Sequence, residues 1–389
     1  MLKKLFKSLG YFLLAILIIA NLFILITGKT YLYKGIANTY LKGRTGPDIT
    51  DLVVFENRTV KTGTPQPWNH SKNYNNFVLT GVENAFFDST ETEAYLVIQN
   101  DSIVFEKYWT EYNSKTISNS FSVAKSVISI LIGIAIDDGL IKNVHQKVSD
   151  FIPEFKKEGL NQISIYHLLT MSSGLSWIES GSNPFSHNAA AYFGTDLKAT
   201  ILKQKLIKEP GKQFKYLSGN TQILAFILKE ATGKTISDYA SEKLWKPIEA
   251  EVAAEWSLDT ENGTEKAFCC LYATAKDFAR IGKLFLQKGK WNGKQIVSEE
   301  YVNQSITPAN ILDEWGKPLT YYGYQWWLIP NYKGYKIHYA RGILGQYIIN
   351  IPAKNMTIVR LGHKRLEKTD RIHPDDVYYN IDIGLKIAN

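Results

Sequence analysis

Apolar positions near the start of the chain form one long uninterrupted run. The stretch "LGYFLLAILIIANLFILIT", Leu9–Thr27, carries no charge and has the length of about 20 residues that a helix needs to cross a bilayer. Lys3, Lys4 and Lys7 precede it, so the positive-inside rule places the N-terminus in the cytoplasm. We therefore predict an uncleaved membrane anchor, with the rest of the chain on the outer, periplasmic or extracellular, face. A cleaved signal peptide is the alternative, although no short apolar core or small-residue cleavage site is clear.

Shorter apolar runs farther along the chain predict strands near both ends of its remaining length. Two β-rich runs flank Asn100 and Asp101 in "EAYLVIQNDSIVFEKYW" and predict a hairpin. The late phrases "YGYQWWLIP", "YKIHYARG", "GQYIINIP" and "MTIVRLG" predict a succession of short strands joined by tight turns. A closing helix is expected from Pro374 onward.

Between these strands, apolar residues recur at helical spacing. They predict helices from Ser122 to a stop at Gly139, over Ser218–Lys234 and over Thr274–Lys290. Residues 177–193 contain the small and turn-forming residues of a loop. Early and late strands with helices between them predict an α+β fold, with helices packed on an antiparallel sheet, rather than alternating βαβ units.

Changes in composition divide the chain into four parts. Residues 1–8 form a short cytoplasmic N-terminus, and 9–27 form the membrane span. Residues 28–76 are rich in Gly, Pro, Asn and Thr, so they are predicted to be a tether and an arm lying on the domain. Residues 77–389 form one globular domain.

Composition and charge exclude several classes of function. The 389 residues are 45% hydrophobic and 21% charged, which is typical of a packed globular core. The net charge of +8 comes from scattered basic residues, so no nucleic-acid partner is predicted. Adjacent cysteines rarely bridge, so Cys269 and Cys270 predict no disulfide and no zinc site. The histidines do not cluster and nucleotide-binding loops are absent, so neither a metal nor an organic cofactor is predicted.

Ser122 and Lys125 are the first candidate for chemistry. They lie three residues apart, about one turn, at the start of a helix whose following residues "SVISILIGIAI" are apolar almost all round. Burial lowers the pKa of a lysine, and a neutral amine beside a serine hydroxyl can act as a general base. The alternative is an N-capping serine with a solvated lysine, because a bare SxxK motif is common.

Two later stretches strengthen the first reading. Tyr216 and Ser218 precede a helix in "FKYLSGNTQ", where two hydroxyls can point at one place, although Ser218 can equally be a plain N-cap. Gly342 and Gly345 interrupt strand-like runs in "HYARGILGQYI", and glycine in a strand often marks close approach of a ligand or another backbone. A free backbone N–H there and the N–H of Ser122 would form an oxyanion hole.

The order of these three motifs resembles that of the serine β-lactamase and penicillin-binding superfamily. The nearest branch is that of class C β-lactamases and the related 6-aminohexanoate-oligomer hydrolases and esterases. Similar connecting phrases extend the resemblance from about Phe77 to the C-terminus, in "ISIYHLLTMSSGL", "PGKQFKYLSGNTQILAFILKEATGK", "YATAKDFARIGKLFL" and "YGYQWWL". The resemblance implies a β-lactamase-like domain, with an antiparallel sheet flanked by helices and a helical region inserted around residues 140–260.

The resemblance also implies a role for each motif. Ser122 is the acylated nucleophile, Lys125 its base and Tyr216 the proton relay. Ser218 orients Lys125 or binds substrate. The backbone N–H groups of Ser122 and Ile343 form the oxyanion hole.

The third motif departs from the family pattern. Ala340-Arg341-Gly342 stands where many β-lactamases have Lys-Thr/Ser-Gly, and Ser218 stands where class C enzymes have asparagine. Gly181 falls where the oligomer hydrolases often carry a tyrosine. The substrate-binding strand Ala340–Gly342 therefore lacks the usual groups that hold a β-lactam carboxylate.

Together, motifs and resemblance predict a membrane-anchored serine hydrolase that cleaves a small ester or amide through an acyl-enzyme. Two alternatives remain. The first is a penicillin-binding or sensory module, in which Ser122 is acylated by a ligand without turnover. The second is a catalytically silent scaffold. An intact Ser122, Lys125 and Tyr216 argue against the scaffold.

Overall fold

A seven-stranded sheet lies at the centre of this computed structural model, which describes residues 2–366 and 372–388. Each pair of neighbouring strands is antiparallel except the last, in which β2 and β4 are parallel. The early hairpin and the late strands thus form one sheet, because β3 pairs with β13. The predicted α+β fold is confirmed. In spatial order the strands are β10 (Trp327–Tyr332), β11 (Tyr335–Gly342), β12 (Gln346–Ile351), β13 (Met356–Gly362), β3 (Thr92–Gln99), β4 (Ser102–Tyr108) and β2 (Asn69–His70).

The hairpin between β3 and β4 turns where the sequence predicts it. Asn100 and Asp101 have φ values of 49° and 61°, the left-handed conformation that both central residues of a type I′ turn require. Asparagine and aspartate tolerate this conformation better than other side chains.

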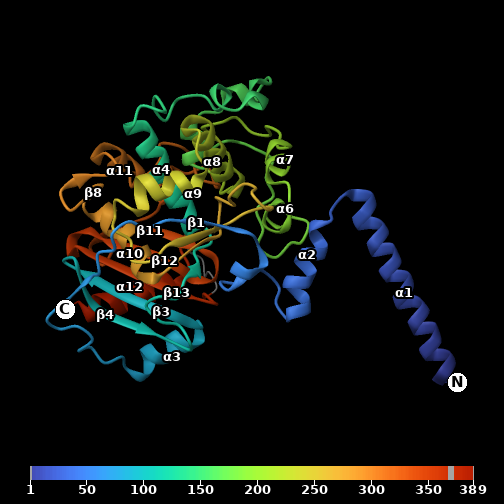
Figure 1. Cartoon of the computed structure of the whole chain (residues 1–389), viewed down its shortest axis with the longest axis horizontal. Helices are drawn as coiled ribbons and strands as arrows, with labels where there is room; N and C mark the ends of the chain where they lie inside the picture. Colours follow the sequence, from blue (N-terminus) through green and yellow to red (C-terminus); the bar gives the residue numbers. More distant parts are fainter. Residues whose placement is uncertain (1, 367–371, 389) are drawn as a thin grey trace.

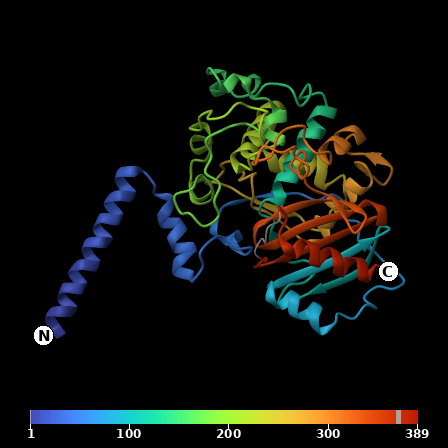
Figure 2. The ribbon, with the colours of Figure 1, turned by 180° about the vertical axis from the view of Figure 1, so that it is seen from behind.

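Helices cover both faces of the sheet, because consecutive residues of strands such as β3 are apolar and point alternately to its two faces. Leu96 and Ile98 of β3 pack into one core, and Tyr95 and Val97 into the other. The helices α4 (Val123–Asp137) and α10 (Ala275–Leu286) contribute to the first core. The helices α3 (Gly81–Ser89) and α12 (Asp375–Ile387) contribute to the second and cover the face seen in Figure 2.

A helical region lies beside α4, to its right in Figure 1, and α8 (Ser218–Thr232) of this region packs against α4. Its last long helix ends at Gly233 in the left-handed conformation, as the sequence predicts. The prediction of a loop over residues 177–193 is wrong in its second half, where α6 forms. The Ser186 side chain caps that helix by accepting a hydrogen bond from the N–H of Ala189 at 3.1 Å. The helices are α5 (Ile165–Leu169), α6 (His187–Phe193), α7 (Leu197–Leu202), α8 (Ser218–Thr232) and α9 (Ile236–Ala240).

Smaller elements complete the domain. A second sheet joins segments far apart in the sequence and is antiparallel throughout. Its strands, in spatial order, are β1 (Asn57–Val60), β6 (Ala254–Ser257), β7 (Leu271–Ala273) and β5 (Ser118–Asn119). The hairpin of β8 (Lys290–Trp291) and β9 (Lys294–Gln295) precedes α11 (Glu299–Ser305).

The N-terminal helix α1 (Leu2–Thr27) stands away from the rest of the chain in both ribbon views (Figures 1 and 2). Only Ile24 of this helix is buried. It is long and apolar enough to cross a bilayer, a test that signal sequences also pass. A short helix, α2 (Tyr31–Asn38), follows it and lies against α6.

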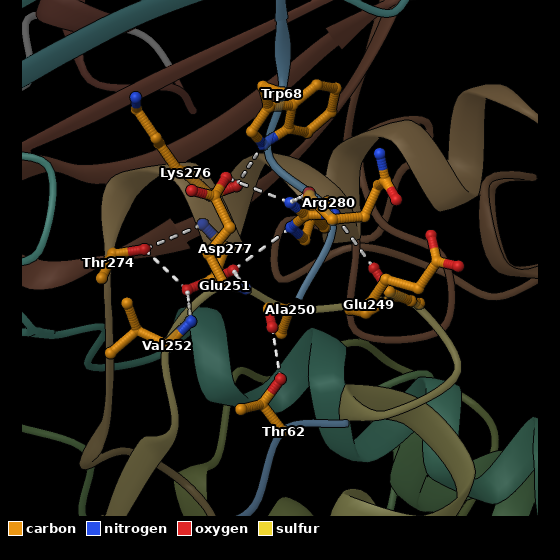
Figure 3. Close-up of polar contacts among 12 residues, drawn as sticks. Thr62, Trp68, Glu249, Ala250, Glu251, Val252, Thr274, Lys276, Asp277 and Arg280 are labelled. Carbon is orange, nitrogen blue, oxygen red and sulfur yellow. Dashed lines mark hydrogen bonds and ion pairs between the residues drawn. The ribbon is translucent and has the colours of Figure 1, made fainter. Parts of the chain in front are cut away.

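The segment of residues 28–76 is bound to the domain along much of its length. Its strands β1 and β2 join the two sheets. In a further attachment, Arg280 of α10 donates a hydrogen bond to the carbonyl of Gln66 in this segment. Figure 3 shows Arg280 between Trp68 of the segment and Asp277. Arg280 is itself held by a buried ion pair with Asp277 at 3.2 Å, and Trp68 donates to the carbonyl of Lys276 at 3.1 Å. The segment is therefore an arm packed on the domain. The division of the chain at residues 76 and 77, drawn from composition, stays a prediction.

Candidate active site

Ser122 lies at a tight turn where the small sheet leads into α4. The preceding residue, Phe121, has a φ of 44°, a conformation that is unfavourable for a bulky side chain. The Asn119 side chain accepts a hydrogen bond from the N–H of Phe121 at 2.9 Å and so holds this turn. Ser122 is half-buried and forms the N-cap of α4, so its hydroxyl lies at the end of the helix where negative charge is favoured.

Lys125 lies one turn into α4 and is buried, with 1% of its surface exposed. Its Nζ donates hydrogen bonds to Ser122 Oγ at 2.9 Å and to the Phe268 carbonyl at 2.6 Å. Burial lowers the pKa of Lys125 to about 8, against the opposing effect of the Glu179 carboxylate. A large fraction of this amine is therefore neutral near pH 8, directly beside the serine hydroxyl.

The Tyr216 hydroxyl is hydrogen-bonded to the Ser122 side chain. The Tyr216 ring stacks on Trp327, with centroids 5.6 Å apart, and its own centroid lies 5.3 Å from Lys125 Nζ. Burial raises the pKa of Tyr216, so the phenol keeps its proton at neutral pH. The site thus combines a protonated phenol and a partly neutral amine at one hydroxyl.

Ser218 is the first residue of α8, and its hydroxyl contacts a carboxylate that the sequence did not single out. Ser218 Oγ and its backbone N–H donate to the two oxygens of Glu179, each at 2.7 Å. The side-chain amide of Asn188 also donates to Glu179 at 2.8 Å. Leu217, not Ser218, occupies the N-cap position, so the plain N-cap reading is wrong. Ser218 therefore lies beside Glu179, the carboxylate whose charge raises the pKa of Lys125.

Cys269 and Cys270 are bonded to each other, which corrects the expectation that these neighbours would not bridge. Cys270 has a φ of 65°, and this left-handed turn folds the chain back enough to bring the two side chains together. Both residues are buried. The turn directly follows Phe268, whose carbonyl binds Lys125, so it belongs to the structure that positions the amine.

The third motif lies at the end of β11. A Cβ at Gly342 would overlap the Ser120 carbonyl oxygen, so only glycine allows this strand to approach the turn before Ser122. Ile343 follows and lines the same pocket as Ser122. Ala340 is buried in the core. The Arg341 guanidinium lies 3.4 Å from the Trp327 ring centroid and donates to the Ile372 carbonyl at 3.3 Å.

A pocket opens beside Ser122 on the side of α2 and α6. Most of the residues that line it are apolar, aromatic or small. They include Tyr31, Leu32, Ile36, Tyr40, Phe121, Ser122, Glu179, Gly181, Asn188, Tyr192, Phe193, Ser218, Phe268, Cys269 and Ile343.

Comparison with known proteins identifies the family. A sequence model of the family described as "Beta-lactamase" matches residues 89–378. The chain belongs to this family. Its fold is that of the β-lactamase-type serine hydrolases.

Relatives within the family carry several names. The chain is 27% identical over 290 residues to a 6-aminohexanoate-dimer hydrolase of Paenarthrobacter ureafaciens, covering 70% of this chain and 73% of the relative. A solved Bacillus anthracis structure, provisionally described as a 6-aminohexanoate-dimer hydrolase, has a TM-score of 0.73 at 23% identity and covers 86% of this chain and 90% of its own. The structure of a family VIII carboxylesterase has a TM-score of 0.60 at 16% identity, and the match covers 78% of this chain and 95% of the esterase chain. These two structures share the fold.

The structure brings Ser122, Lys125, Tyr216 and Ser218 together with Ile343, as the sequence predicts; their catalytic roles stay predictions. Ala340 is buried in the core, and Arg341 lies over Trp327, on which Tyr216 also stacks. Sequence reasoning missed Glu179, Asn188 and the Phe268 carbonyl. Glu179 lies in "SWIESG", within the stretch that was predicted to be a loop, and no motif marks it.

Proposed function

We propose that this β-lactamase family member hydrolyses small esters or amides through an acyl-enzyme on Ser122. The contact of Lys125 Nζ with Ser122 Oγ at 2.9 Å is the observation that carries the proposal. Two relatives support the substrate class by name, one as a hydrolase of 6-aminohexanoate dimers and one as a carboxylesterase.

In the first step, neutral Lys125 takes the proton of Ser122 while Oγ attacks the carbonyl carbon. The backbone N–H groups of Ser122 and Ile343 stabilise the resulting oxyanion. When the intermediate collapses, the C–O or C–N bond breaks and Tyr216 delivers a proton to the leaving alcohol or amine. Lys125 then gives the proton that it took from Ser122 to the Tyr216 phenolate, so that both groups return to their starting protonation states. A water molecule then attacks the acyl ester, which releases the acid and restores Ser122.

Esters and amides are expected to be better substrates than β-lactams. The strand Ala340–Gly342 lacks the usual lysine and hydroxyl that hold a β-lactam carboxylate, and Arg341 lies over Trp327 rather than among the residues that line the pocket at Ser122. Purified full-length protein should be assayed against short-chain esters, linear amide oligomers, D-amino-acid peptides and a chromogenic cephalosporin. We expect kcat/KM to be highest for an ester or amide. A cephalosporin turned over faster than every ester would contradict this, and a burst without turnover would favour the sensory module.

We further propose that α1 anchors the protein in a membrane, with the domain on the outer face. The uncharged run Leu9–Thr27 within α1, which is exposed except at Ile24, supports this. The full-length protein is expected to remain in the membrane pellet after a carbonate wash, and protease added from outside should reach residues beyond Thr30. A shortened soluble form would show instead that the segment is a cleaved signal.

A further inference from the structure

The helix that follows α1 forms one wall of the pocket at Ser122. Leu32, Gly35, Ile36 and Thr39 all line this pocket. Their spacing of three and four residues places them on one face of α2. A segment that composition marks as a tether thus directs a continuous helical face toward the nucleophile.

Specific contacts hold this wall in place. The Tyr31 hydroxyl donates to the Pro184 carbonyl at 3.1 Å, across the mouth of the pocket. A Cβ at Gly35 would lie 3.3 Å from the Phe193 ring, so glycine lets α2 pack closely on α6. Because Phe193 also lines the pocket, the two helices form adjoining walls.

The pocket has the chemistry of a site for an apolar chain. Glu179 is the one charged side chain among its described lining residues. That carboxylate already accepts hydrogen bonds from Ser218 and Asn188. A substrate carboxylate would therefore meet no cation here, whereas a hydrocarbon chain would contact Leu32, Ile36 and their aromatic neighbours.

Part of the pocket rim is apolar, beside the exposed polar residues Ser182 and Asn183. Ile36 is 39% exposed and Tyr40 is 48% exposed, and both line the pocket. Phe185, next to the lining residue Pro184, is 51% exposed and packs edge-to-face on Phe23 of α1 with centroids 5.9 Å apart. Apolar surface therefore continues from the pocket mouth to the helix that is long enough to cross a bilayer.

The position of Tyr216 indicates which part of the substrate enters. Tyr216 bonds Ser122 but is not among the residues that line this pocket. In the proposed mechanism Tyr216 protonates the leaving group, so the leaving group lies on the Tyr216 side of Ser122. The pocket beside α2 is left for the acyl group.

We propose, resting on the proposed function, that α2 is the acyl-chain wall of the site, which is selective for esters or amides with a medium or long apolar acyl chain. The chain can belong to a membrane lipid or to a free amphiphile, since both present the same hydrocarbon. Each methylene that the pocket buries should raise kcat/KM about fourfold.

The test uses the full-length protein in detergent micelles with p-nitrophenyl acetate, butyrate, octanoate and palmitate. For the wild type, kcat/KM is expected to rise from acetate to octanoate. Ile36→Trp, whose larger side chain takes up space in the pocket, should lower octanoate turnover at least tenfold and lower the octanoate-to-acetate ratio of kcat/KM. Ile36→Ala should lower octanoate turnover less. Val53→Trp is the matched control, because Val53 is 89% exposed and does not line the pocket.

An octanoate-to-acetate ratio that Ile36→Trp leaves unchanged would overturn the inference. The same is true of a wild type that prefers acetate. A second arm offers a long-chain ester embedded in phosphatidylcholine vesicles: turnover in vesicles that exceeds turnover in micelles identifies a membrane source, and the reverse identifies a free amphiphile. Acetate hydrolysis that survives in Ser122→Ala would instead refute the proposed function, independently of Ile36.

Discussion

Ser122→Ala is expected to abolish both ester hydrolysis and labelling by a fluorophosphonate probe. Labelling requires a serine oxygen that attacks phosphorus and displaces fluoride, and the Ala side chain offers no such atom. Ser122 is half-buried at the pocket, so its loss removes little packing and the fold should remain. In-gel fluorescence of the labelled full-length protein, with circular dichroism of the same sample, measures both expectations.

Ser129→Ala provides the matched control for this experiment. Ser129 is buried in the same helix, where its hydroxyl lies 3.2 Å from that of Tyr301. It is two turns from Ser122, and its loss should leave labelling intact. Persistent labelling of Ser122→Ala would show that another residue is the nucleophile.

Lys125→Met is expected to lower the acylation rate by roughly 100- to 10,000-fold, the usual range for a positioned proton-transfer group. Methionine replaces the length of the lysine side chain without the amine, so it fills the same buried space. Because an apolar side chain is not penalised by burial, the variant should fold at least as well as the wild type. Stopped-flow measurement of acylation by a p-nitrophenyl ester separates this step from deacylation.

The pH dependence of the same rate follows from the pKa of Lys125, which is about 8. Below this pH the amine is protonated and cannot accept the Ser122 proton, so kcat/KM should fall about tenfold per pH unit. Above it, the rate should level off. Glu179 raises this pKa, so Glu179→Gln should move the midpoint to lower pH. A midpoint that stays in place, or a rate that falls as pH rises through 8, would contradict Lys125 as the base.

Lys266→Met tests whether a buried lysine as such affects the rate. Lys266 is fully buried, and burial lowers its pKa well below the usual value. Its Nζ lies 3.3 Å from the Phe55 ring centroid, and Lys266 is not among the residues that line the pocket at Ser122. Acylation by this variant should match that of the wild type. An equal loss in both lysine variants would indicate a structural effect.

Local patterns predicted most elements of the fold correctly. Asn100 and Asp101 turn the first hairpin, and Gly233 ends α8, because these positions have left-handed backbones that Asn, Asp and Gly adopt readily. The helix α6 was missed, since a seven-residue helix has too few turns to show a period, and its Ser186 cap alone is a weak signal. The pairing of β3 with β13 joins strands more than 250 residues apart, which no local pattern specifies.

The candidate site, like the fold, could be predicted only in part from the sequence. Ser122 and Lys125 could be paired from sequence because one helical turn fixes their distance. Tyr216 could be added only through motif order, since the contact with Ser122 depends on how the two segments fold together. Glu179 and the Phe268 carbonyl had no sequence signal, because a loop carboxylate and a backbone oxygen acquire a function only from what lies beside them. The bond between Cys269 and Cys270 likewise depends on the left-handed turn at Cys270.

By itself, the sequence determined the apolar N-terminal helix, the α+β order of elements and the placing of Ser122 one helical turn from Lys125. Each of these depends on residues close together in the chain, where helical and strand periods act directly. Only the tertiary structure decided what surrounds Ser122. It turned the segment after α1 into a pocket wall and directed Arg341 onto Trp327. These outcomes depend on packing between distant segments, because a side chain lies where the assembled core leaves room and partners for it.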